Sequence, residues 1–175
     1  MKKGFLLFLS LVMAISIWGS FGANKATAAT AVREKIYLER AHKLQWSLYN
    51  EREFTKARIY ATMSKGFTKE FIDQFFQYYF KKAGVNAQGE QLYYNPAGDN
   101  MTYSVTRFTW NKKDLYGKQK YPAVNYTVIG SRLYVSVSQY QFDAMMGNHV
   151  YTVKMVKKKN SREPLRVYAI QRQYE

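Results

Sequence analysis

The sequence predicts an α+β fold, in which N-terminal helices pack on the concave face of a curved, mainly antiparallel sheet. Two observations lead to this prediction. Between residues 33 and 83, large apolar side chains recur at the helical spacing of three and four residues. Between residues 90 and 173, apolar and polar side chains alternate, as they do in strands. Helices followed by strands are typical of an α+β domain, because a parallel α/β sheet would alternate the two.

Three helices are predicted in the first half. The first covers about residues 33–50, and the second lies within residues 52–67 and ends near Gly66. The third, "KEFIDQFFQYYFKK" at residues 69–82, follows the N-cap candidate Thr68 and places Lys81 and Lys82 in its last turn. We expect this aromatic helix to fill the concave side of the sheet. Its apolar face consists of Phe71, Ile72, Phe75, Phe76, Tyr79 and Phe80.

Strands are predicted within residues 90–95, 101–110, 123–129, 132–142, 149–158 and 165–173. The last three strands should form an antiparallel meander, because short turn-forming stretches separate them. Alternation assigns three residues of each of these strands to one face: Leu133, Val135 and Val137, then Tyr151, Val153 and Met155, and finally Leu165, Val167 and Ala169.

Residues 1–28 have the composition of a signal peptide. "MKK" is a positive start, residues 4–19 are uncharged and mainly apolar, and Ala26 and Ala28 have the spacing that a signal peptidase recognises. The apolar run is shorter than the ~20 residues of a comfortable membrane span. We therefore predict cleavage after Ala28, with Ala23 as the alternative, and a single secreted or envelope-associated domain at residues 29–175.

The order of elements resembles the cone-shaped NTF2-like (cystatin-like) fold. A closer resemblance lies in "AHKLQWSL" at residues 41–48 and "FTKEFIDQFF" at residues 67–76. These stretches are similar to the helical region of an uncharacterised family of small secreted proteins from bacilli. That family's A-x-x-x-Q-x-x-L pattern is matched by Ala41, Gln45 and Leu48, and its F-T-x-E-F-I phrase by residues 67–72. The resemblance implies a secreted protein from a Gram-positive bacterium and supplies no catalytic residues.

No catalytic, metal or cofactor site is predicted. The chain has no cysteine, which excludes disulfides and thiolate ligands. Its two histidines, His42 and His149, have no carboxylate cluster nearby in the sequence, so we do not expect them to ligate a metal ion. Phosphate-binding and dinucleotide-binding motifs are missing as well. The sequence therefore favours a binding protein over an enzyme.

The NTF2-like resemblance implies a second interpretation, in which a pocket between sheet and helices binds or converts a small apolar ligand. In a simpler interpretation, the aromatic members of this pocket fill the space as core. The candidate pocket residues are Phe75, Phe76, Tyr79, Tyr103, Tyr126, Gln139, Gln141, Asp143 and His149.

Charge gives the strongest functional indication. Loss of Lys2, Lys3 and Lys25 with the signal peptide leaves 24 basic against 12 acidic residues, a net charge of +12 that attracts polyanions. Two basic clusters stand out: Lys112, Lys113, Lys118 and Lys120 form the first, and Lys154, Lys157, Lys158, Lys159, Arg162, Arg166 and Arg172 the second.

Tyrosines are interleaved with the first cluster, as in proteins that bind single-stranded nucleic acid. Export argues against that partner and favours an anionic cell-wall polymer or lipid head groups. The sequence thus predicts a secreted, non-enzymatic binding or accessory protein of the anionic cell envelope. Two alternatives stay open. The charge could serve only solubility, or the chain could be a subunit or inhibitor that offers an aromatic or sheet face to a protein partner or a second copy.

Overall fold

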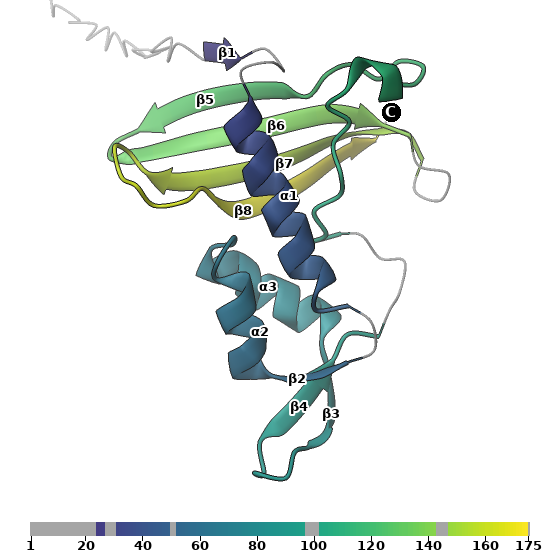
Figure 1. The fold of residues 1–175 in the computed structure, drawn as a ribbon, viewed down its shortest axis with the longest axis vertical. Coiled ribbons are helices and arrows are strands. Elements are labelled where there is room, and N and C mark those ends of the chain that lie inside the picture. Colours follow the sequence, from purple (N-terminus) through teal and green to yellow (C-terminus); the bar gives the residue numbers. More distant parts are fainter. Residues whose placement is uncertain (1–23, 27–30, 50–51, 97–101, 143–146, 175) are drawn as a thin grey trace, which may run out of the picture.

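The computed structural model describes residues 24–26, 31–49, 52–96, 102–142 and 147–174. These residues form three α-helices and two antiparallel sheets, which confirms the α+β class (Figure 1). The helices are α1 (Val32–Trp46), α2 (Lys56–Met63) and α3 (Lys69–Tyr79). All three were predicted, although α1 ends earlier than expected and α2 begins later, after the N-cap Thr55.

The larger sheet has the strand order β1-β5-β6-β7-β8, and every neighbouring pair is antiparallel. The predicted meander is therefore confirmed. β1, which pairs with β5, was not predicted as a strand, because it falls within the segment assigned to the signal peptide. The strands are β1 (Asn24–Ala26), β5 (Ala123–Ile129), β6 (Arg132–Gln141), β7 (His149–Lys158) and β8 (Arg166–Tyr174).

A bulge in β8 corrects one predicted face. Met155 pairs with Val167, whereas Lys154 pairs with Ala169, so one extra residue is inserted between these pairs. Beyond the bulge, Ile170 lies opposite the buried Val153 and packs against the core. The assignment of Ala169 to the same face as Val167 was therefore wrong.

The smaller sheet contains β2 (Glu53–Thr55), β3 (Lys81–Val85) and β4 (Gln91–Tyr94) in the order β2-β4-β3. The prediction of Lys81 and Lys82 as the end of a helix was wrong. α3 stops at Tyr79, because Phe80 is extended and leads into a hairpin. Asn86 stabilises that hairpin, since its side-chain oxygen accepts hydrogen bonds from the backbone N–H groups of Gln88 and Glu90.

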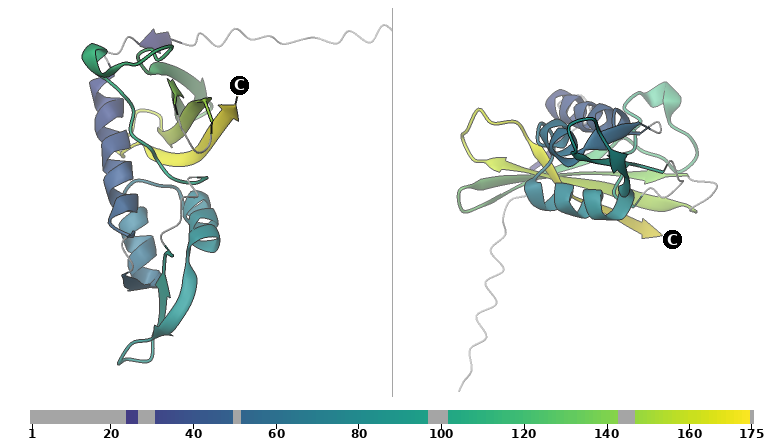
Figure 2. Two further views of the ribbon diagram at one scale, coloured as in Figure 1. Left: turned by 90° about the vertical axis from the view of Figure 1, so that its right-hand side faces the viewer. Right: turned by 90° about the horizontal axis from the view of Figure 1, so that it is seen from below.

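The aromatic face of α3 is core, but it packs against the β8 edge rather than filling the concave side. The backbone N–H of Thr68 donates to the carbonyl of Val167, which fixes the start of α3 beside β8. Phe71 and Phe75 are buried and stack at a ring distance of 6.4 Å. α1 instead crosses the face of the larger sheet (Figure 2).

Residues 102–110 fill the space between α1 and the larger sheet, and we call them the inner segment. None of them belongs to a strand, so the strand predicted at residues 101–110 was wrong. In place of a neighbouring strand, side chains from α1 and β6 form hydrogen bonds with the backbone of the inner segment. From α1, Gln45 donates to the carbonyl of Tyr103 and accepts from the N–H of Val105, both at 2.7 Å. From β6, Gln139 accepts from the N–H of Thr109 and donates to its carbonyl.

Candidate functional site

A groove rich in cations lies at the end of the sheet where the β5–β6 and β7–β8 turns meet. Its volume is about 550 Å³. The backbone N–H of Lys159 donates to the carbonyl of Ser131, which holds the two turns side by side. We call this site the basic groove. Its charged lining residues are the cations Lys69, Arg132, Lys157, Lys158 and Arg166 and the acids Glu70 and Glu163.

Strand register brings most of these cations together. Arg132 at the start of β6 lies opposite Lys158 at the end of β7, and Arg166 at the start of β8 lies opposite Val156. Three adjacent strands thus supply cations at the same end of the sheet. Lys69 comes from the first turn of α3, and the partial positive charge of that helix end adds to the field.

Few carboxylates neutralise the basic groove. Lys69 forms an ion pair with Asp73 at 2.7 Å, and their hydrogen bond raises the pKa of Lys69 and lowers the pKa of Asp73. Among the described residues, no carboxylate lies within ion-pair distance of Arg132, Lys158 or Arg166. The groove therefore offers cations to an external anion.

Only part of the second predicted basic cluster lies at the basic groove. Lys157, Lys158 and Arg166 line the basic groove, and Lys159 and Arg162 are exposed in the adjoining turn region. Lys154 lies elsewhere, beside Tyr134 and Tyr168 in a shallow depression on the sheet.

Arg172, the remaining member of that cluster, lies near the other end of β8. Its guanidinium donates to the carbonyls of Thr102 and Ser104 and lies 4.8 Å from the ring centre of Tyr151. It therefore holds the inner segment. Lys69 and Arg132 were missed by the sequence reasoning, because each stands apart from the dense basic stretches and reaches the groove only through the tertiary fold.

The first predicted cluster lies at the opposite end of the sheet. Lys112, Lys113, Lys118 and Lys120 are all exposed, on or after the short 3₁₀ helix η1 (Lys112–Asp114). Figure 1 shows η1 at the end of the sheet away from the β5–β6 turn. The ten residues of β6 span roughly 30 Å between these ends, at ~3.3 Å per residue. The two clusters are therefore separate surfaces.

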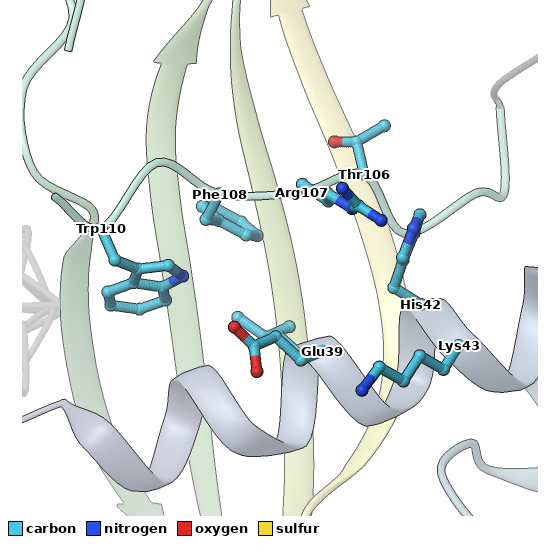
Figure 3. A pocket seen from close by; sticks show the side chains of 8 residues that line it. Glu39, His42, Lys43, Thr106, Arg107, Phe108 and Trp110 are labelled. Carbon is cyan, nitrogen blue, oxygen red and sulfur yellow. The ribbon is translucent and has the colours of Figure 1, made fainter. Parts of the chain in front are cut away.

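A second groove, of about 320 Å³, lies between α1 and the inner segment, and we call it the α1 groove. Figure 3 shows Glu39 on α1 facing Phe108 and Trp110 across it, with Lys43 extended along the same helix. His42 is held in place at its rim, because Nδ1 lies 2.6 Å from the carbonyl oxygen of Val105. A carbonyl only accepts hydrogen bonds, so Nδ1 carries the proton. The remaining lining residues are Leu38, Thr106 and Arg107.

The predicted pocket residues do not line the α1 groove. Phe75 and Tyr79 belong to the core, and Phe76, Tyr103 and Tyr126 pack against it. Gln139 and Gln141 hold the inner segment, and His149 is buried, with Nδ1 donating to the carbonyl of Gly147. Asp143 lies outside the described residues.

No three His, Asp or Glu side chains in the described part of the chain are placed to hold a metal ion. Within the same residues, no helix is both long and apolar enough to cross a membrane.

Comparison with known proteins identifies the family. The family model described as "Protein of unknown function (DUF3993)" matches residues 33–128, more than half of the chain. The chain belongs to the DUF3993 family. The match runs from α1 through the inner segment to β5, so it extends well beyond the two stretches that first indicated an uncharacterised family. No curated protein and no solved structure matches the chain.

Proposed function

We propose that this DUF3993 protein is a secreted, non-enzymatic binding protein that attaches to an anionic polymer of the cell envelope through the basic groove. One observation supports this most strongly: five cations from three strands and one helix line a single groove that contains two acids. Clustered cations on a strongly basic chain raise the local concentration of polyanions and speed their association.

The proposed location outside the cell is supported by residues 1–28. Their positive start, apolar run and A-x-A spacing have the pattern of a cleaved signal peptide. The resemblance to secreted proteins of bacilli favours a Gram-positive envelope, whose wall polymers carry phosphate. An exported protein meets these polymers before it meets nucleic acid.

We also propose that the fold is a variant of the NTF2-like cone. The antiparallel sheet with α1 across one face supports this (Figure 2). The inner segment occupies the space between sheet and helix, where NTF2-like proteins commonly hold a pocket. Because the inner segment fills this space, we expect the protein to bind its partner at the surface and not in an interior pocket.

Binding to purified cell walls tests the proposed function. The secreted protein should sediment with walls at low salt and be released as salt rises, because exposed charges are screened over only ~8 Å at physiological ionic strength. Walls from which the anionic polymers have been stripped should bind much less. Equal binding to stripped and intact walls, or no binding at low salt, would refute the proposal.

A second candidate function is the binding of a small ligand in the α1 groove. The observation that favours it is the combination of two aromatic walls, Phe108 and Trp110, with charged groups at the rim. Such pockets bind ligands with an apolar body and a charged group. Quenching of tryptophan fluorescence by a panel of aromatic acids and amines tests this. The response should vanish in Trp110→Phe and persist in Trp46→Phe.

A further inference from the structure

A chain of aromatic rings reaches the surface at the η1 end of the sheet. The rings of Tyr140 and Phe142 lie 5.1 Å apart, and those of Phe142 and Tyr116 lie 5.6 Å apart. Tyr116 is 76% exposed and Phe142 is 42% exposed. Adjoining exposed rings are not explained by core packing, and they typically mark a contact surface.

The loop that presents Tyr116 has a defined structure. The backbone N–H of Gln119 donates to the carbonyl of Tyr116 at 2.9 Å, which closes a turn. Gly117 within this turn has a φ of 56°, and a Cβ atom there would lie 2.9 Å from the Phe142 ring. Only glycine combines this backbone conformation with such a close approach. The turn therefore packs on Phe142 and directs Tyr116 outward.

Lysines share the loop with Tyr116. Lys112, Lys113, Lys118 and Lys120 are exposed on the same loop, which contains one acid, Asp114. Asn111 donates to that carboxylate at 3.0 Å. We call Tyr116, Phe142 and these four lysines the aromatic tip. Tyrosine is enriched at membrane–water interfaces, and each lysine near an anionic bilayer strengthens the attraction to it.

We propose that the aromatic tip contacts the surface of an anionic lipid bilayer, with the two rings in the interfacial region and the lysines at the head groups. Net positive charge complements anionic lipid, and rings on the outside of a loop can enter a fluid interface. The inference rests on the proposed envelope location but does not depend on the basic groove. Because the two sites lie at opposite ends of the sheet, the protein could bind lipid and wall polymer together.

Vesicle binding by the secreted protein tests this proposal. Vesicles of phosphatidylcholine with phosphatidylglycerol should bind it, and vesicles of phosphatidylcholine alone should bind much less. Tyr116→Ser, and separately the pair Lys112→Glu with Lys113→Glu, should each lower the affinity by about tenfold or more. Matched controls are Tyr78→Ser, on an exposed tyrosine of α3, and Lys81→Glu with Lys82→Glu, on the β3–β4 hairpin. The controls should bind as the unchanged protein does.

Insertion of the aromatic tip into the bilayer can be measured separately. Tryptophan fluorescence of a Tyr116→Trp variant should shift to shorter wavelength and be quenched by lipids brominated near the head group. Unquenched fluorescence, or vesicle binding that the Tyr116 and lysine changes leave intact, would overturn the proposal. Loss of vesicle binding only after changes in the basic groove would overturn it too. Wall binding should be unchanged in Tyr116→Ser, so failure of either proposal leaves the other open.

Discussion

Two buried glutamines determine where the inner segment lies. Gln45 and Gln139 are 2% and 3% exposed, and each uses both its amide and its carbonyl group on the backbone of the inner segment. A carboxamide can replace a strand partner in this way, because it carries the same donor and acceptor as a peptide group. Sequence patterns indicated an extended segment here but could not reveal its partners, which lie at least 30 residues away along the chain.

Replacement of Gln45 by leucine tests this role. Gln45→Leu leaves the carbonyl of Tyr103 and the N–H of Val105 without these hydrogen bonds, so we expect a loss of about 1–3 kcal/mol in the free energy of unfolding. Urea denaturation measures the change. Gln74→Leu, at an exposed position of α3, is the matched control and should be nearly neutral. Equal effects of the two changes would contradict the assigned role.

Tyr151 should make the stability of the protein depend on pH in the alkaline range. Its hydroxyl donates to the carbonyl of Ser104 and accepts from the N–H of Thr106, and burial raises its pKa to about 12. Unfolded tyrosine titrates near pH ~10. The pKa of Tyr151 is thus higher in the native state than in the unfolded state. Its contribution to the free energy of unfolding is therefore complete below pH ~10 and is lost as the pH rises toward 12.

The free energy of unfolding should therefore be compared between the unchanged protein and Tyr151→Phe as a function of pH. We expect the phenylalanine variant to be less stable by about 1–3 kcal/mol near neutral pH, with a difference that shrinks between pH ~10 and ~12. A difference that stays constant across this range would show that Tyr151 titrates as an exposed tyrosine does.

The helices and the meander followed from periodicity, but the ends of these elements did not. α3 was predicted to include Phe80, Lys81 and Lys82, whose composition suits a last helical turn. These residues instead extend into β3, because pairing with β4 provides hydrogen bonds that a longer helix would forgo. Such pairing depends on a distant strand, so helix propensity alone did not predict it.

The packing of α3 leads to a graded prediction. Phe75 is 0% exposed among other aromatic rings, whereas Phe76 is only partly buried, against Tyr60 and Tyr93. Phe75→Ala should destabilise the protein by about 3–5 kcal/mol, and Phe76→Ala by less. Reversible chemical denaturation measures both changes. A loss below ~1 kcal/mol for Phe75→Ala would mean that this ring is not core.

β1 links the fold to processing of the N-terminus. Cleavage after Ala28 would remove β1 and uncover the β5 edge, whereas cleavage after Ala23 would keep the pairing of Asn24 with Tyr126. If the chain is exported, we expect mass spectrometry of protein recovered from the culture medium to show a start at Ala29. Backbone amides of the uncovered β5 edge should then exchange rapidly with deuterium. A start at Asn24 would contradict this prediction, and full-length protein in the membrane fraction would favour an uncleaved anchor.

The sequence predicted the sign of the protein's net charge but not how the charges are arranged on its surface. Both basic clusters were recognisable as dense stretches, yet their separation by the length of the sheet depends on strand register. The same register adds Arg132 to the basic groove, and the contact of α3 with β8 adds Lys69. Neither residue has a local signal that would have identified it.

Binding in the basic groove is tested by the affinity for a soluble polyphosphate chain, measured over a range of salt concentrations. The triple change Arg132→Gln, Lys158→Gln and Arg166→Gln removes three cations of the basic groove, and Lys65→Gln, Lys81→Gln and Lys82→Gln removes three exposed cations elsewhere. Only the groove variant should bind about tenfold or more weakly and show a flatter dependence on salt, because fewer counterions are released on binding. Equal weakening of both variants, or binding that survives molar salt, would contradict a site in the basic groove.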